Sequence, residues 1–328
     1  MDAAIKELNK KAEGYSKVTG KIISEVEKVI VGQQDVMKKV VVALAANGHV
    51  LLEGMPGLAK TMMIKTLSDT IAVNFRRIQF TPDLLPADII GTKIYNQKTG
   101  SFTTKKGPIF SNFILADEIN RAPPKVQSAL LEAMQERQVT ISGETLVLEK
   151  PFLVLATQNP IETEGTYALP EAQVDRFMMK INLGYPSIEE EKEILHRMTE
   201  GKIPEARKTA TAKSILELQQ FVPKIYADEK IHDYVTKIVH ATRDPHKYNI
   251  GVDGHIQYGA SPRASLWLVL GAKAWALLEG RGYVLPEDVK AIAKDVLRHR
   301  ILLTYEAEAE EITADSVIEK ILAKIKAP

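Results

Sequence analysis

The 328-residue sequence contains no cysteine. Disulfides, thiolate catalysis and metal sites held by cysteine are therefore excluded. Neither sign of charge is in excess, since 43 Lys and Arg residues face 42 Asp and Glu residues, and no overall basic field would hold a nucleic acid non-specifically. No apolar run approaches the roughly 18 residues that span a bilayer. The charged start Met1–Lys11 also lacks the apolar core of a signal peptide, so we expect a soluble, cytoplasmic protein.

The spacing of apolar residues divides the chain into three parts. Residues 1–29 have helical spacing, and Gly14 predicts a break between two helical pieces. Residues 30–184 alternate short apolar runs with helical patterns, which favours an α/β fold with a mostly parallel sheet covered on both faces. Residues 187–328 carry helical patterns alone, one of them over Pro286–Leu302, so we expect an all-α domain there. The predicted strands are His49–Leu52, Ile78–Phe80, Phe113–Leu115, Phe152–Ala156 and Met178–Ile181.

Two segments of the middle part resemble antiparallel hairpins. Thr92–Thr104 has a turn at Lys98-Thr99-Gly100, and Gln138–Leu148 has one at Ser142-Gly143. We expect both to be insertions into the α/β frame. A long polar loop, Arg243–Gly259, is expected before one of the later helices.

A phosphate-binding loop is the strongest motif. Gly54-Met55-Pro56-Gly57-Leu58-Ala59-Lys60-Thr61 follows a predicted strand and precedes a helical pattern, which is the context that a P-loop requires. Backbone N–H groups at the helix start would bind phosphate oxygens, Lys60 would neutralise them, and Thr61 would place a hydroxyl on Mg²⁺. Ala59 stands where the general pattern has its last glycine. We expect this departure to matter little, because alanine tolerates the right-handed helical conformation.

Two further strand ends carry polar groups that suit nucleotide hydrolysis. The run Phe113–Ala116 is followed by Asp117 and Glu118, and the carboxyl ends of parallel strands are where ligands collect. Asp117 would hold the shell of a Mg²⁺ ion, and Glu118 would act as general base toward the attacking water. After the run Phe152–Ala156, Asn159 could orient that water.

These residues resemble the AAA+ ATPases, and within them the MoxR group. Asp117–Ala122 looks like the Walker B segment, and Leu155–Pro160 like the sensor-1 strand with Asn159 as the sensor. Leu169–Phe177 resembles the stretch whose arginine, here Arg176, enters the site of a neighbouring subunit. Gly259–Ala264 resembles the sensor-2 start, with Arg263 opening a lid helix. A cation at a helix start is unfavourable unless an anion such as a γ-phosphate is present.

The resemblance implies an α/β core with strand order 5-1-4-3-2, a small helical lid, and ATP bound in the cleft between them. It implies Mg²⁺, a hexameric ring, chaperone-like activity on protein complexes, and partners with von Willebrand factor A domains. The two hairpins match inserts shared with magnesium-chelatase subunits and MCM helicases. Catalytic roles fall on Glu118, Asn159, Arg176 and Arg263, and metal-binding roles on Thr61 and Asp117. The implied nucleotide-binding residues are Val31, Gly32, Gln33, Gly54, Pro56, Gly57, Leu58, Ala59, Lys60, Thr61 and Arg263.

Two other functions remain open at this point. One is a motor of the MCM or magnesium-chelatase type that acts on nucleic acid or another complex. The hairpin over Gln138–Leu148 has no basic residue and carries Glu144 near its tip, and a negative tip repels phosphate. The other is an ATP-binding scaffold with little turnover, which would not need Glu118, Asn159 and Arg176. The sequence names no client protein.

Overall fold

The computed structural model describes residues 3–160, 165–201 and 204–328. Its first element is one continuous helix, α1 (Ala3–Val29), so the predicted break at Gly14 is wrong. A glycine inside a helix costs only about 1 kcal/mol relative to alanine. Packing offsets this cost, because α1 contacts α10 (Pro262–Leu278), α3 (Lys60–Ile71) and α2 (Gln34–Ala45) along its length.

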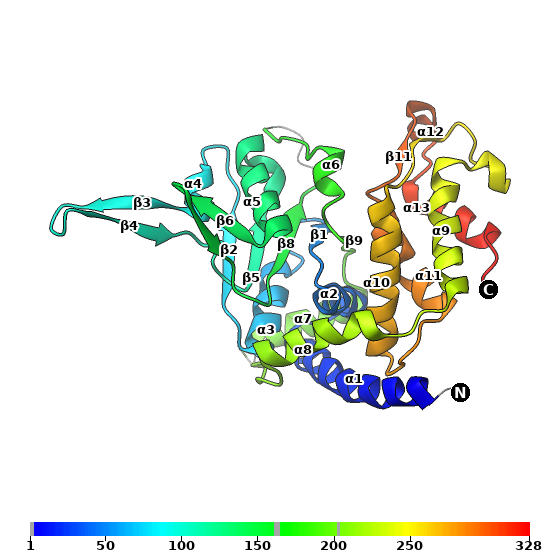
Figure 1. Cartoon of the computed structure of the whole chain (residues 1–328), viewed down its shortest axis with the longest axis horizontal. Helices are drawn as coiled ribbons and strands as arrows, with labels where there is room; N and C mark the ends of the chain where they lie inside the picture. The colour runs from blue at the N-terminus through cyan, green and yellow to red at the C-terminus, as the bar shows by residue number, and fades with distance from the viewer. Residues whose placement is uncertain (1–2, 161–164, 202–203) are drawn as a thin grey trace.

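A five-stranded parallel sheet forms the centre of the molecule (Figure 1). Its order, β2-β5-β8-β1-β9, is the expected order 5-1-4-3-2 read from the other edge. The predicted α/β fold is confirmed. The strands are β1 (Val50–Glu53), β2 (Phe75–Gln79), β5 (Phe113–Asp117), β8 (Leu153–Gln158) and β9 (Met179–Asn182).

Buried and edge strands differ in how clearly the sequence marks them. The central strands β1, β5 and β8 are continuous apolar runs, because helices cover both of their faces. The edge strand β2 begins at Phe75, three residues before the predicted run, and its exposed residues Arg76 and Arg77 hide that start. The polar ends of β5 and β8 carry the sheet on to Asp117 and Gln158.

Alternate residues of the same strand enter two different hydrophobic clusters. In β5, Phe113 and Leu115 pack with α1, α2 and α3, whereas Ile114 and Ala116 pack with α5 (Pro124–Glu136) on the opposite face. Side chains of a strand point alternately to either face, which produces this division. Two short helices, α4 (Pro86–Ile90) and α6 (Glu171–Val174), and the 3₁₀ turn Ile119–Arg121 complete this part of the chain.

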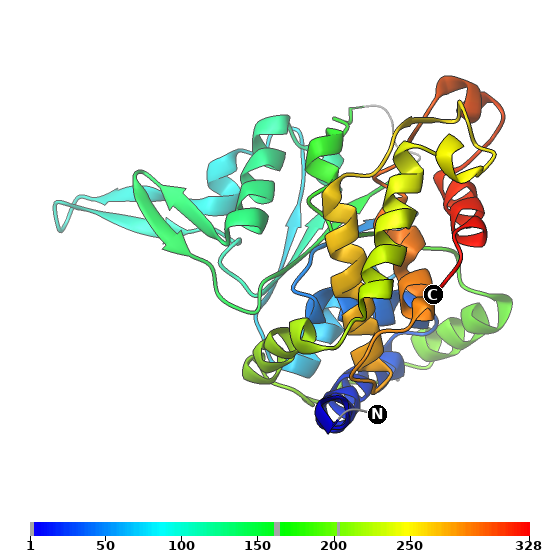
Figure 2. The same cartoon turned by 45° about the vertical axis from the view of Figure 1, so that its right-hand side comes forward.

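Both predicted hairpins are present. The first consists of β3 (Gly91–Asn96) and β4 (Ser101–Lys106), and the second of β6 (Gln138–Ile141) and β7 (Glu144–Val147). Figure 2 shows the β3–β4 hairpin projecting far from the body. Its turn contains Gly100 with φ 61°, and the second turn contains Ser142 and Gly143 with φ 48° and 83°.

Helices dominate the rest of the chain, but two short strands interrupt them. The antiparallel pair β10 (Ile256–Tyr258) and β11 (Leu302–Leu303) was not predicted, and the helix expected to reach Leu302 ends at Leu297. Every helix in the described ranges is too short or too polar to cross a bilayer. The helices are α7 (Ile188–Thr199), α8 (Ala212–Phe221), α9 (Glu229–Arg243), α11 (Pro286–Leu297), α12 (Tyr305–Ala309) and α13 (Ala314–Lys324).

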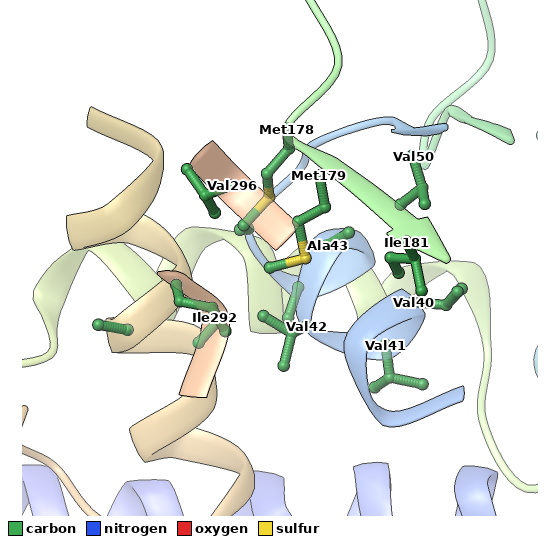
Figure 3. Packing of buried hydrophobic residues seen from close by; sticks show 14 of the residues in the cluster. Val40, Val41, Val42, Ala43, Val50, Met178, Met179, Ile181, Ile292 and Val296 are labelled. Carbon is green, nitrogen blue, oxygen red and sulfur yellow. The ribbon is translucent and has the colours of Figure 1, made fainter. Parts of the chain in front are cut away.

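One hydrophobic cluster joins the sheet to the later helices. Met178 and Met179, at the start of β9, lie between α2 and the α11 residues Ile292 and Val296 (Figure 3). All four side chains are fully buried. Gly271 lets α10 approach this junction, because a Cβ there would lie 2.4 Å from Ile292. The helices α10 and α11 are thus held against α2 and the edge strand β9.

Candidate active site

The phosphate loop runs from the end of β1 to the start of α3. Lys60 is the first residue of α3, and its Nζ donates a hydrogen bond to the carbonyl oxygen of Gly54 at 2.6 Å. Burial lowers the pKa of Lys60, although the negative charges of Asp117 and Glu118 act in the opposite direction. The cation is therefore held inside the loop, where a phosphate oxygen could replace the Gly54 carbonyl as its partner.

The backbone conformation of Ala59 differs from the one expected from the sequence. Ala59 has φ 53° and ψ 22°, in the left-handed region and not in the right-handed one. A residue with a Cβ pays about 1–2 kcal/mol for that conformation, which explains why the general motif has glycine at this point. The loop thus stores backbone strain directly before Lys60.

Asp117 and Glu118 stand at the end of β5, as predicted. Thr157, at the end of the adjacent β8, links them: its hydroxyl donates to Asp117 Oδ1 at 2.6 Å and accepts from the Glu118 backbone N–H at 2.8 Å. Glu118 has φ 56° and is therefore also in the left-handed region. This conformation turns the chain out of the strand, so that consecutive carboxylates do not simply alternate between the two faces of the sheet.

The edge strand β2 supplies two polar side chains that were not predicted as site residues. Arg77 donates from Nε and Nη2 to Asp117 Oδ2, at 2.9 and 2.6 Å. Gln79 donates to Glu118 Oε2 at 2.7 Å and accepts from Arg77 at 2.6 Å. Both carboxylates are thus engaged from the neighbouring strand. The only sequence signal was the alternation of polar residues in β2, which by itself indicates an ordinary edge strand.

Residues of the phosphate loop line one cavity of about 400 Å³ together with Glu118 and Asn159, two of the four predicted catalytic residues. A cation, a hydroxyl, carboxylates and an amide face it, from Lys60, Thr61, Asp117, Glu118 and Asn159. The described residues contain no cluster of three or more His, Asp or Glu side chains that could hold a metal alone. A carboxylate and a hydroxyl beside a phosphate loop do suit Mg²⁺, which takes one or two protein ligands and completes its shell with phosphates and water.

A second, apolar cavity of about 160 Å³ adjoins the first. The loop residues Gly57, Leu58 and Ala59 line both cavities. Val31 and Gln33 line the apolar one, together with residues of α7, so the predicted adenine-flanking segment lies beside the phosphate loop. Apolar walls with few polar groups are typical of sites for planar rings. Gly32 has φ 71°, in the left-handed region that favours glycine, and lies against the end of the Glu190 side chain.

Arg176 and Arg263 do not reach the phosphate cavity. They line a third cavity of about 430 Å³, together with Trp267 of α10 and with His49, which precedes β1. Arg176 Nη1 donates to the Leu131 carbonyl at 3.0 Å. His49 precedes β1 and the phosphate loop follows it, so the two arginines lie near the opposite end of this strand from the loop. The structure brings the two together, as the sequence did not predict, and separates Arg263 from the other implied nucleotide-binding residues.

Comparisons with known proteins agree with this architecture. Residues 49–179 match the model of the ATPase family associated with various cellular activities (AAA), and residues 251–321 match that of the AAA lid domain. The chain is 51% identical over 307 residues to the chaperone MoxR1 of Mycobacterium tuberculosis, covering 93% of this chain and 81% of the relative. The chain belongs to the MoxR family of AAA ATPases.

Other members of the MoxR family are similar over nearly the full chain. The protein MoxR of Methylorubrum extorquens is 30% identical, with 93% of each chain covered. A crystal structure of a candidate ATPase from Cytophaga hutchinsonii superimposes with a TM-score of 0.92 at 50% identity, covering 100% of both chains. The predicted resemblance to MoxR-type AAA+ ATPases is confirmed. The roles of individual residues stay predictions.

Proposed function

We propose that this MoxR-family protein is a Mg²⁺-dependent ATPase whose hydrolysis cycle drives the remodelling or maturation of protein complexes. The observation that carries the proposal is the convergence of Lys60, Thr61, Asp117, Glu118 and Asn159 on one cavity. Phosphoryl transfer to water needs such a set of groups, because its catalysis depends on positioning and on charge stabilisation. The similarity to a relative named as a chaperone supports the second half of the proposal.

Each side chain of the cavity has its own task. Lys60 and the N–H groups at the start of α3 bind and neutralise phosphate oxygens. Asp117 and Thr61 would hold Mg²⁺, which when bound stabilises the charge that develops on the transferring phosphoryl group. Glu118 takes the proton of the attacking water, and Asn159 orients that water. ATP would place its base in the apolar cavity beside Val31 and Gln33.

Arg176 and Arg263 would act on the nucleotide of a neighbouring copy. They line a cavity beside His49, which precedes β1, whereas the phosphate loop of the same chain follows the other end of β1. A surface that donates arginines at one side and a cavity that receives them at the other make a head-to-tail contact, which forms a ring where the rotation between copies closes. We therefore propose a ring of copies, hexameric as in the resembling family, and working in the cytoplasm.

A protein client suits the β6–β7 hairpin better than a nucleic acid does. Residues 138–147 of the β6–β7 hairpin include no Lys or Arg, and Glu144 at the turn pairs with Lys93 at 3.7 Å. The client, and a partner with a von Willebrand factor A domain, would be sought by affinity capture with Glu118→Gln held in ATP. This variant should keep the client-engaged state, whereas Lys60→Ala serves as the control that cannot reach it.

Mixing two inactive variants tests the ring mechanism. Arg176→Ala keeps the phosphate cavity but lacks one donated arginine, and Glu118→Gln keeps both arginines but lacks the base. Mixed rings, confirmed by native mass at several ratios, should regain turnover at sites where the two variants adjoin. Turnover that never exceeds the sum of the two parents contradicts the action of Arg176 on a neighbour.

A further inference from the structure

Asp175, directly before Arg176, links the two arginines. Its side chain is mostly buried, with 18% exposed. Oδ1 and Oδ2 accept hydrogen bonds from the Ser261 hydroxyl at 3.1 and 3.0 Å, and Oδ2 lies 3.6 Å from Nη1 of Arg263. One carboxylate thus contacts the residue that caps α10 and the arginine two positions later.

The partner of Asp175 on its other side is Arg300, whose side chain is 1% exposed. Arg300 Nε donates to Asp175 Oδ1 at 2.8 Å, and its Nη2 donates to the carbonyl oxygens of Asp175 and Phe177 at 2.9 and 2.6 Å. Nη1 donates to the Met178 carbonyl at 3.2 Å. A single guanidinium therefore holds both the carboxylate and the backbone of the segment that carries Arg176.

These contacts fix the start of α10 as well. Ser261 Oγ accepts a hydrogen bond from the Arg263 N–H at 3.2 Å and is the N-cap of the helix. A serine N-cap stabilises the start of a helix, and a carboxylate near a helix start is favoured by the helix dipole. Asp175 orients the hydroxyl and partly balances the charge of Arg263 at that same helix start. Neither arginine is held by its own side-chain contacts alone.

We propose that Asp175, held by Arg300, is a positioning residue that sets Arg176 and Arg263 as one unit aimed at the nucleotide of the neighbouring copy. This inference rests on the proposed action of the arginines in the ring. Asp175 lines a different cavity and is not among the residues that line the phosphate cavity of its own copy. Its loss should therefore slow hydrolysis at the neighbour's site, to which the subunit donates its arginines. Hydrolysis at the subunit's own site, which receives arginines from the other neighbour, should stay intact.

The mixed-ring assay separates these two effects. Asp175→Asn is first added to the arginine-donating subunit, as Glu118→Gln/Asp175→Asn mixed with Arg176→Ala. Turnover should fall roughly tenfold to hundredfold relative to the mixture without Asp175→Asn, because misplacing a catalytic group by about 1 Å has effects of that size. Asp175→Asn is then added to the receiving subunit, as Arg176→Ala/Asp175→Asn mixed with Glu118→Gln. Turnover in this arm should stay within about twofold of the original mixture, a difference of only about 0.4 kcal/mol.

Asp288→Asn is the matched control. Asp288 is buried, pairs with Arg281 through two hydrogen bonds and accepts from the Leu285 N–H, but lines neither the phosphate cavity nor the arginine cavity. It should affect both arms equally. Ser261→Ala, which removes the hydroxyl bonded to Asp175 and no buried charge, should cause a smaller loss in the donating arm alone. This second variant tests the inference even where Asp175→Asn does not fold.

Each outcome bears on one of the two claims. If the original mixture regains no turnover, the proposed action of the arginines on a neighbour is wrong. Suppose instead that the original mixture regains turnover. If Asp175→Asn and Ser261→Ala then lower turnover in neither arm, or equally in both arms, the positioning role of Asp175 is wrong. A loss confined to the donating arm is the result that the structure predicts.

Discussion

Arg176 and Arg263 line the same cavity, and that cavity shares no residue with the one formed by the phosphate loop. This relationship explains why an arginine stands at the start of α10, where the helix dipole disfavours a cation. Asp175 offsets part of that cost within the chain, at 3.6 Å from Arg263. In the proposed ring, the anion of a neighbouring nucleotide would offset the rest.

The first prediction concerns nucleotide binding. Lys60→Ala should abolish ATP binding, because the loop loses the cation that is held between the Gly54 carbonyl and the two carboxylates. Titration with a fluorescent ATP analogue measures this. Lys65→Ala is the matched control, since it lies on the same helix beyond the cavity. Undiminished affinity of Lys60→Ala would show that this loop does not bind the phosphates.

Arg77 should compete with Mg²⁺ for Asp117. Its guanidinium donates twice to Asp117 Oδ2, and the side chain is 48% exposed, so the pair is worth only about 0.2–1 kcal/mol. Arg77→Gln should therefore lower the Mg²⁺ concentration for half-maximal nucleotide binding by at most about fivefold. Arg76→Gln, on the other face of β2, should change nothing. An increased Mg²⁺ requirement in Arg77→Gln would mean that Arg77 itself binds the phosphates.

His49 should make the protein less stable in mild acid. Its ring is buried, Nδ1 accepts from the Val154 N–H at 3.0 Å, and Nε2 lies 3.1 Å from the Met134 carbonyl. Burial, and secondarily the charge of Arg137, lowers the pKa of His49 to about 3. Between that value and the ordinary 6.5, the unfolded chain binds a proton that the folded chain does not. The free energy of unfolding must therefore fall as the pH drops below 6.5.

Urea unfolding at pH 7 and pH 5 measures this effect. His49 should contribute on the order of 2 kcal/mol to the difference between the two pH values. In His49→Gln that difference should shrink by the same amount, whereas the exposed His232→Gln should behave as the wild type. An unchanged difference in His49→Gln would show that the folded protein accommodates a charged imidazole.

Local motifs made much of this site predictable from the sequence. The loop that carries Lys60 follows β1, Asp117 ends β5 and Asn159 follows β8, so the parallel strands alone bring these residues to one end of the sheet. Arg77 and Gln79 escaped prediction because their role depends on the pairing of β2 with β5, which juxtaposes residues about 40 positions apart. The backbone of Ala59 was predicted wrongly, since the turn from the loop into α3 takes a left-handed conformation that alanine does not prefer.

The most direct test of the central claim is the behaviour of Glu118→Gln. This variant should bind ATP as the wild type does, because the phosphate contacts of the loop are intact. It should hydrolyse ATP about 10²–10⁴ times more slowly, because an amide cannot take the proton of the attacking water. Binding and turnover are measured on the same preparation in Mg²⁺. Retained binding with lost turnover is the predicted result, and turnover near the wild-type rate would contradict the assignment of this cavity as the site of ATP hydrolysis.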